Sequence, residues 1–443
     1  MVSRYPLIKI SNLAQKIGMG PFGSSIKVET FKEIGVPIIN GQHLRGSKLL
    51  DKGFNYISES HAMRLLNANV GCGDVVFTHR GNIGQVSYIP KNSEYKKYIV
   101  SQSQFFIRPI PSVVSPEYLT YYFISPEGQT KLRANLSQTG VPAMAQPTTY
   151  VKSLEIPLPS LEIQKAITNI LGSLDEKIEL NTKVNEKLEG IAQALFKSWF
   201  IDFDPAKAKA EGRDTGLPEH ISSLFPASFV DSELGQIPEG WNISVLGHLC
   251  AIPQYGYTAS AEVESVGPRF LRITDINKSP WIEWESVPYC TINDEERDKY
   301  LLELGDILIA RMADPGHGVV VEEDIDAVFA SYLIRFRPLK QEYSRYIQYW
   351  LRSDQYWRII EARKTGTTRA SINAKEMGRF PLIIPNMAAL KLFSSIIDKL
   401  RGAGNQNIRI NATLGKLRNT LLPKLISGEL PIPDAERIVG RCL

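Results

Sequence analysis

The sequence has few cysteines, and they are scattered. Its four cysteines, Cys72, Cys250, Cys290 and Cys442, form no CxxC pair and have no histidine at a metal-binding distance along the chain. Disulfide frameworks and zinc sites both depend on such spacings. We therefore expect reduced thiols, as in a cytoplasmic protein, and no metal site.

Long apolar runs and an excess of one charge are also missing. Runs such as 307–310 are far shorter than the roughly 18 residues that cross a bilayer, and residues 1–10 lack the apolar core of a signal peptide. The net charge is only +4, from 51 Lys and Arg against 47 Asp and Glu. Neither a membrane protein nor an exported one is predicted. Any nucleic-acid site must be argued from local pattern.

Catalytic motifs are missing as well. Residues 18–23 spell GxGxxG, but no buried strand precedes them and Pro21 lies inside, so a surface loop is the better interpretation. There is no GxxxxGK[ST] phosphate loop, and the stretch 202–205 lacks the second proline of the motif that holds an amine for methylation. The six histidines show no HExxH spacing. The chain is therefore predicted to bind rather than catalyse, with no catalytic residue and no cofactor of its own.

What the sequence does contain is an internal repeat at a shift of 226 residues. Pro159 aligns with Pro385, and Asn181 aligns with Asn407. Each copy has the pattern of a long helix, over roughly 160–199 and 386–426, which at 1.5 Å per residue would be about 60 Å long. A helix of that length exceeds the interior of one small domain.

Apolar residues recur at heptad spacing in both helices. In the first, Ile167 and Leu174 occupy one seam position, and Val184 and Ile191 occupy the other. Two matched seams predict an antiparallel coiled coil. Asn181 and Asn407 share one seam position, where a buried asparagine fixes register, and we expect them to lie near each other at the midpoint. The alternative is two separate amphipathic helices, each packed on its own domain.

About 150 residues before each helix also match each other. The run 73–80 resembles 305–311, and 105–109 resembles 333–338, as short β-rich segments bounded by Gly, Asp and Pro. The predicted fold is α+β: two α/β domains in pseudo-twofold tandem repeat, separated by two long antiparallel helices. The predicted boundaries are 1–158 for the first domain, 159–200 for the first helix, 201–237 for a polar linker, 238–384 for the second domain, 385–427 for the second helix and 428–443 for a C-terminal tail.

Loops of both domains collect Arg, Gln, His and aromatic residues, the types that contact base edges and phosphates. Arg80 and Arg311 both end a strand after a Gly-Asp turn, so we expect them in equivalent places. The alternative is that these are solvated surface residues. The candidate DNA-binding residues are Gln42, His43, Arg45, His79, Arg80, Gln102, Gln104, Tyr257, Arg272, Arg311, His317, Arg363, Lys364 and Arg369.

This doubled order resembles the DNA-specificity subunit of type I restriction-modification systems. The resemblance covers essentially the whole chain, and these segments carry it: 156–164 at the start of the first helix, 196–200, Pro238-Glu239-Gly240-Trp241, the two Gly-Asp turns, and 422–430. The first domain lacks the Pro-x-Gly-Trp opening, and the second helix lacks the Glu-x-Gln of the first. Those departures put in doubt an identical arrangement at both ends.

The resemblance implies a non-catalytic cytoplasmic subunit with two target recognition domains, each recognising half of a bipartite double-stranded DNA site. The helix pair would be the spacer. Two modification subunits would supply S-adenosylmethionine and methylate adenine, and two restriction subunits would use ATP and Mg. The predicted docking surface for the modification subunits consists of Phe196, Trp199, Phe200, Phe203, Leu421, Leu425 and Ile426. The alternative is that these residues cap the helix pair against a domain.

Two other function classes stay open at this point. One is a single-chain DNA-modifying enzyme with an unrecognised active site, and the other is a coiled-coil adaptor that does not bind DNA. Catalysis by the purified chain alone would favour the first. Failure to retain DNA selectively once modification subunits are added would favour the second.

Overall fold

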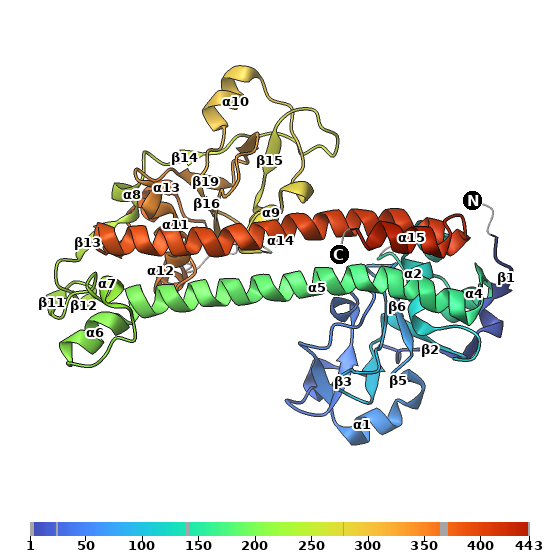
Figure 1. Ribbon diagram of the computed structural model, residues 1–443. Coiled ribbons are helices and arrows are strands. Elements are labelled where there is room, and N and C mark those ends of the chain that lie inside the picture. The colour runs from blue at the N-terminus through green and yellow to red at the C-terminus, as the bar shows by residue number, and fades with distance from the viewer. Residues whose placement is uncertain (1–3, 24, 138–140, 278, 364–370, 442–443) are drawn as a thin grey trace. The chain divides into compact units, whose positions relative to one another are not determined.

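The computed structural model describes residues 4–441 except 24, 138–140, 278 and 364–370. The chain divides into two compact units, Met1–Asn181 with Arg409–Leu443, and Thr182–Ile408. Two long helices, α5 (Leu161–Phe196) and α14 (Met387–Ser427), each run without a break from one unit into the other. Figure 1 shows the first domain in blue to cyan and the second in yellow to orange.

The first domain contains two four-stranded sheets. The antiparallel one has the order β2 (Ala14–Met19), β9 (Gln104–Pro109), β6 (Val75–Thr78) and β7 (Val86–Tyr88). The mixed one has the order β4 (Asn55–Ile57), β3 (Val36–Ile39), β8 (Tyr98–Val100) and β5 (Asn69–Val70), with β3 and β8 parallel. The short strands β1 (Leu7–Lys9) and β10 (Glu155–Pro157) pair and bring the two ends of the domain together.

Short helices connect these strands. They are η1 (Ile10–Asn12), η2 (Val28–Thr30), η3 (Gly41–His43), α1 (Glu59–Arg64), η4 (Leu66–Ala68), α2 (Pro116–Ile124), α3 (Pro126–Arg133) and α4 (Pro147–Ser153). Serine side chains and N-terminal prolines begin α2 and α3, because a serine hydroxyl accepts a free N–H of the first turn and proline has no N–H to leave unpaired.

The second domain repeats this topology. Its sheet has the order β14 (Gln254–Tyr255), β19 (Leu333–Phe336), β16 (Ile307–Ala310) and β17 (Gly318–Val320), next to a parallel pair β15 (Arg269–Leu271) and β18 (Ala327–Phe329), and β13 (Asn242–Val245) pairs with β20 (Pro381–Ile384). Its helices are α8 (Leu246–Leu249), α9 (Ile273–Ile276), η6 (Trp284–Ser286), α10 (Asp294–Tyr300), α11 (Gln341–Trp350), α12 (Asp354–Arg363) and α13 (Ala374–Gly378). The predicted tandem repeat of one α/β domain is confirmed.

One buried ion pair occupies the same place in both domains. Asp74, directly before β6, accepts two hydrogen bonds from Arg108 of β9, at 2.7 and 2.6 Å. Asp306, directly before β16, accepts two from Arg337, at 2.7 and 2.8 Å. Each carboxylate also accepts the backbone N–H three residues earlier, at 2.9 Å. The pair explains why the Gly-Asp and Arg-Pro elements recur in the sequence.

The long helices contribute to the apolar core of each unit. In the first unit, Leu174 of α5 and Leu421 of α14 are buried together with residues of β6, β9 and α2. In the second, Phe196 of α5 and Phe393 of α14 are buried with residues of α11 and β19. Each helix therefore packs on both domains, one half on each, and not on its own domain alone.

The asparagines of the helix seam have partners that the sequence did not predict. In the first unit Asn181 donates to Asn411 at 2.8 Å, and in the second Asn407 donates to Asn185 at 2.9 Å. Four residues forward on α5 correspond to four residues back on α14, as an antiparallel pair requires. Asn181 and Asn407, which were expected to lie near each other, belong to different units, and each bonds another asparagine of its own unit.

The heptad seam is wrong in the second half of α5. Val184 and Ile191 were predicted to lie in the seam, but they are 38% and 55% exposed. The buried face there passes through Asn185 and Glu189 instead. Glu189 accepts a hydrogen bond from Tyr349 at 3.1 Å, so a polar contact with the second domain determines which face of the helix is covered.

Two segments expected to be loosely structured are folded. The π-helical turn η5 (Lys197–Ile201) ends the predicted first helix. The predicted linker contains α6 (Asp204–Ala210), α7 (Glu219–Ser222) and the hairpin β11 (Phe229–Ser232) with β12 (Gly235–Pro238). Phe225 and Ile237 bury its apolar side in the core of the second unit. The predicted tail forms α15 (Ile432–Val439), whose Ala435 and Val439 are buried in the first unit. The sequence signal for folding in both segments was the set of apolar residues that occur singly among polar ones.

Replacing the buried carboxylate should weaken both domains alike. We expect Asp74→Ala and Asp306→Ala each to lower the free energy of unfolding by about 2–4 kcal/mol, since each removes a buried carboxylate that bonds a guanidinium and a backbone N–H. Urea unfolding of the full chain measures the change. The control Lys97→Met removes an exposed ion pair with Glu59 and should cost less than about 1 kcal/mol. Equal losses for all three variants would contradict a structural role of the buried pair.

Candidate nucleic-acid interface

The ends of β6 and β16 define equivalent positions in the two domains. His79 donates its backbone N–H to Ser103 at 2.9 Å, and Arg311 donates its own to Tyr332 at 3.0 Å. The strand registers, Thr78 with Gln104 and Ala310 with Leu333, agree with this match. Arg311 therefore corresponds to His79, and the expectation that it matches Arg80 is wrong by one residue. Arg80 corresponds to Met312.

His79 and Arg311 do the same structural work with different chemistry. The Nε2 atom of His79 lies 3.2 Å from the carbonyl oxygen of Gln102, and Arg311 donates through Nε to the carbonyl of Ser331 at 3.0 Å. Burial lowers the pKa of His79, and the charge of Arg80 acts in the same direction, although the hydrogen bond to Gln102 opposes them. His79 is therefore better described as holding the loop than as contacting DNA.

Two other predicted DNA-binding residues are committed to the fold. In η3, Asn40 donates its backbone N–H to His43 at 3.0 Å, and in α9, Arg272 donates its own to Asp275 at 2.9 Å. His43 is fully buried and stacks on Phe54 with ring centroids 4.3 Å apart. The guanidinium of Arg272 is bonded to Asp275 at 3.0 and 2.9 Å. The structure contradicts a direct role in DNA contact for His43, and it gives Arg272 an internal partner.

A polar hollow of about 380 Å³ lies in the first domain beside the ends of β6 and β8. It brings together four of the predicted residues, and its lining is Asn40, Gly41, Gln42, Arg45, Thr78, Arg80, Asn82, Gln85, Ser101, Ser103 and Gln104. Arg45 and Arg80 are exposed, and their side chains make no hydrogen bond or ion pair with another residue in the described part of the chain. Gln104 is buried at the base.

Sequence reasoning missed the neutral members of this hollow. Thr78 ends β6, and Gln85 directly precedes β7, so both flank the glycine-containing loop 81–84. Neither is among the predicted residues, although the prediction includes three other glutamines. Position beside a loop that connects two paired strands was the signal that could have found them.

The predicted DNA-binding residues of the second domain make different kinds of contact from one another. The guanidinium of Arg311 lies 5.0 Å from the ring centre of Tyr255, and Nε2 of His317 lies 2.9 Å from a carboxylate oxygen of Asp314. Tyr257 is half-buried against Tyr300. Arg363 is exposed, as is Gln102 in the first domain, which does not line the hollow. Lys364 and Arg369 lie outside the described residues.

The positions equivalent to the lining of the hollow carry different side chains in the second domain. Thr78 donates its N–H to Gln85 at 3.0 Å, and Ala310 donates its own to His317 at 2.8 Å, which matches Gln85 with His317. The same ladder gives the other equivalences: Ala310 for Thr78, Met312 for Arg80, Tyr332 for Ser103 and Leu333 for Gln104. The backbone is shared, whereas the side chains that it presents differ in chemistry.

The predicted partner-docking cluster is buried inside the chain. Trp199 and Phe200 are packed among Phe225, Trp241 and Phe393 of the second unit. The remaining members are buried in the same way: Phe196 and Phe203 in the second unit, and Leu421, Leu425 and Ile426 in the first. The docking prediction is wrong for these side chains. The alternative, capping of the helices against a domain, describes them.

Charged side chains attach the second domain to α14. Glu322, nearly buried, accepts hydrogen bonds from Arg401 of α14 at 2.9 and 2.7 Å and from Arg345 of α11 at 2.6 Å. Burial raises the pKa of Glu322, but the hydrogen bonds and charges of Arg401 and Arg345 outweigh it and lower the pKa to about 2. The Glu322 carboxylate is therefore ionised at neutral pH.

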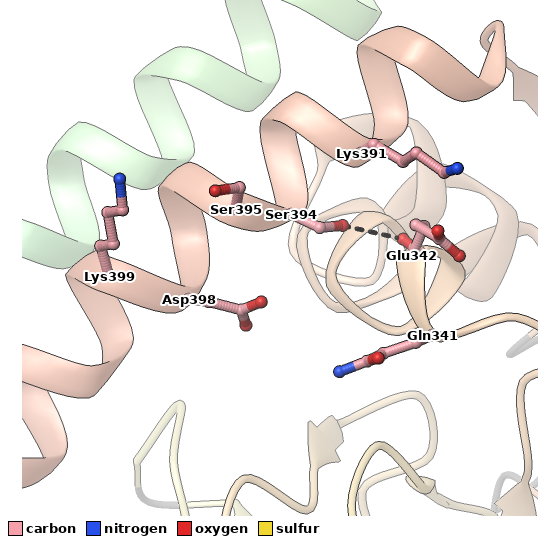
Figure 2. A pocket seen from close by; sticks show the side chains of 7 residues that line it. All are labelled: Gln341, Glu342, Lys391, Ser394, Ser395, Asp398 and Lys399. Carbon is pink, nitrogen blue, oxygen red and sulfur yellow. Dashed lines mark hydrogen bonds between the residues drawn. The ribbon is translucent and has the colours of Figure 1, made fainter.

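Beside this network, α11 and α14 enclose a second hollow of about 490 Å³ (Figure 2). Ser394 donates its hydroxyl to the carbonyl of Glu342 at 3.1 Å, which joins α14 to the domain. Lys391 and Lys399 of α14 stand near Glu342 and Asp398, so both signs of charge line the space. Such a mixture favours no ligand of a single charge.

Within the described residues, no three His, Cys, Asp or Glu side chains are grouped so that they could hold a metal ion. The described helices also include none with the length and apolarity of a membrane span. The candidate functional sites are therefore the ends of β6 and β16 and the loops beside them.

Two copies of one α/β domain that present different side chains from equivalent edges define a protein with two recognition surfaces. Residues 23–190 and 238–414 match the family described as the type I restriction modification DNA specificity domain. The match covers well over half of the chain, and the chain belongs to this family. It is a specificity subunit, the non-catalytic component of a restriction-modification system.

Similar proteins agree with this assignment. The chain is 24% identical to the type I restriction enzyme HindI specificity subunit of Haemophilus influenzae, over 81% of this chain and 86% of that one. It is 28% identical to the MjaIX specificity subunit of Methanocaldococcus jannaschii, over 82% and 78%. The crystal structure of a type I S subunit from M. genitalium has a TM-score of 0.55 at 16% identity and covers 96% of both chains, which supports the fold.

Removing the buried carboxylate of Glu322 should destabilise the second unit in a pH-dependent way. A depressed pKa contributes stability that is complete above the unfolded pKa near 4.5 and is lost as the pH falls through about 2. We expect Glu322→Gln to cost about 3–5 kcal/mol at pH 7, because Arg401 is left buried without its partner, and to cost less at pH 2.

Urea unfolding of the full chain between pH 7 and pH 2 measures this difference. The matched control is Asp326→Asn, which removes an exposed ion pair with Arg297 and should cost less than about 1 kcal/mol. A loss for Glu322→Gln that stays constant over this range would show that the ion pair is not its cause.

Proposed function

We propose that each α/β domain recognises one half of a bipartite double-stranded DNA target. The observation that carries the proposal is the shared backbone with different side chains at its edge: Thr78 and Gln104 in the first domain face the same way as Ala310 and Leu333 in the second. Base edges are distinguished by the donors, acceptors and methyl groups that meet them. Different edges on one scaffold therefore favour two different half-sites.

Among the predicted DNA-binding residues, the exposed and half-exposed ones keep this role in the proposal. They are Gln42, Arg45, Arg80, Gln102, Tyr257, Arg272, Arg311, His317 and Arg363. His79 and Gln104 are buried, and in this proposal they hold the end of β6 in place without contacting DNA. Arg45 and Arg80 suit phosphate contacts or guanine, because a guanidinium without an internal partner can donate to either.

Arg80→Ala tests this assignment. If Arg80 contacts a phosphate, binding should weaken on all sequences, and the slope of log affinity against log salt should fall by about 0.9. If it recognises guanine, one base position of the first half-site should relax instead. Titration of labelled duplexes by the complex with modification subunits, at several salt concentrations, separates the two. No change in affinity, salt slope or selectivity would exclude Arg80 from the interface.

We infer that the helix pair sets the distance between the half-sites, since α5 and α14 each connect the two units without a break. Deleting 182–188 with 404–410 removes one heptad from each helix and keeps the antiparallel register. It shortens the pair by about 10 Å, which is roughly three base pairs of B-DNA.

Methylation mapping of this deletion variant should show a target with a shorter spacer between unchanged half-sites. Loss of methylation is also compatible with the inference, provided that the complex still assembles, because the half-sites rotate by about a third of a turn relative to each other. An unchanged spacer between unchanged half-sites would contradict it.

Catalysis belongs to partners in this proposal. Two modification subunits supply S-adenosylmethionine and methylate adenine, and two restriction subunits use ATP and Mg, in the cytoplasm. The purified chain should neither methylate nor cleave DNA with these cofactors present, and methylation should appear when modification subunits are added. Activity of the chain alone would favour the single-chain enzyme instead.

A further inference from the structure

Four side chains of the first domain form one hydrogen-bonded chain at the polar hollow. The hydroxyl of Ser101 donates to Gln104 Oε1, and Gln104 Nε2 donates to Thr78 Oγ1 at 3.3 Å. The hydroxyl of Thr78 donates to Gln85 Oε1 at 3.1 Å, and Gln85 Nε2 donates to the carbonyl of Gly41 at 2.9 Å. All four bonds run in one direction. Each link therefore fixes which way the next amide faces.

The fold does not require this chain, because the second domain is built without it. Ser101 donates its backbone N–H to Ile39 at 2.9 Å, as Ala330 does to Leu271 at 2.9 Å, so the backbones match. The residues that stand at the positions of Ser101, Thr78 and Gln104 in the second domain are Ala330, Ala310 and Leu333. None of the three has a polar side chain.

A buried polar side chain lowers the stability of a fold when an apolar side chain can occupy the same position. Thr78 and Gln104 are both almost fully buried. Withdrawing their amide and hydroxyl groups from water costs free energy that internal hydrogen bonds only offset, whereas Ala310 and Leu333 fill the same space without that cost. The polar set of the first domain is therefore explained by a ligand and not by folding.

These hydrogen bonds leave a specific set of free donor and acceptor sites on the amide of Gln85, which lines the hollow. Its bonds to Thr78 and Gly41 use one lone pair of Oε1 and one N–H of Nε2, so one acceptor and one donor remain side by side. An amide in this state complements the N6 donor and N7 acceptor of adenine in the major groove. Guanine offers two acceptors there, which oppose the amide oxygen.

We propose that Gln85 recognises an adenine in the first half-site, and that Thr78 and Gln104 are positioning residues that hold its amide in the required orientation. This inference rests on the proposed function of the first domain. It also assigns a difference between the half-sites: His317 stands at the position of Gln85 in the second domain, without the chain that would orient it.

The first test is Gln85→Leu, expressed with the modification subunits in a host without other adenine methylation. Methylation mapping should show that one adenine of the first half-site is no longer required, with discrimination at that position reduced roughly 10- to 100-fold and the second half-site unchanged. Unchanged specificity at every position overturns the proposal. So does uniform loss of methylation by an intact complex, because it indicates a contact that does not depend on sequence.

The second test is Thr78→Ala with Gln104→Leu, which installs the residues that the second domain carries at these positions. Because that domain folds with them, the variant should fold and assemble, and it should lose discrimination at the same single position. The matched control is Thr120→Ala, which removes a buried hydroxyl of α2 that bonds the carbonyl of Pro116 at 2.8 Å and does not line the hollow. The control should keep both half-sites. A double variant with unchanged specificity overturns the positioning role.

The unmodified complex separates this inference from the proposed function. If the proposed function fails, the unmodified complex gives no bipartite methylation pattern. If only the inference fails, the bipartite pattern is present and Gln85→Leu leaves it unchanged.

Discussion

The paired hydrogen bonds of Asp74 with Arg108 and of Asp306 with Arg337 are the constraint on which the recognition edges depend. Each joins the start of one central strand to its neighbour in the sheet. Because the side chains of a strand alternate and its register is fixed, that bond also determines which residues appear at the far end of the strand. The edge can then vary in sequence while its backbone stays in place.

The turns after the strands also keep one backbone arrangement with different side chains. The N-cap of η3 uses Asn40 with His43, and the N-cap of α9 uses Arg272 with Asp275, with different side chains and the same backbone bonds. His79 and Arg311 bond equivalent carbonyls in the next loop. Framework positions thus tolerate a change of chemistry as long as one hydrogen bond is preserved. Positions that face the hollow have no such requirement, and the polar Thr78 and Gln104 are replaced there by the apolar Ala310 and Leu333 of the second domain.

The sequence was sufficient to predict the architecture and insufficient to predict the site in detail. The repeat at 226 residues and the heptad periodicity predicted two domains and two long helices, because both are properties of many residues at once. The equivalence of Arg80 and Arg311 failed because residue type was matched without the strand register. Only the backbone bonds of His79 and Arg311 showed the true correspondence.

Burial was the other property that sequence could not supply. Phe196, Trp199 and Phe200 have the composition of an interface, but whether aromatics face a partner or the chain's own core depends on what packs over them. Here Phe225, from the predicted linker, and Trp241, from the start of the second domain, cover them. The prediction that His43 contacts DNA failed for the same reason, because its side chain is buried in the first domain. The hydrogen-bonded set around Thr78 and Gln85 was invisible because neutral residues far apart in sequence form it.

The central claim is that both domains present the same edge of one scaffold to DNA. Amide hydrogen exchange of the full complex with modification subunits, with and without its cognate duplex, tests it most directly. The account predicts slower exchange on DNA binding at equivalent segments of the two domains: 40–46, 78–85 and 101–104 in the first, and 272–277, 310–317 and 330–333 in the second. Protection of segments that are not equivalent, or of one domain only, would contradict it.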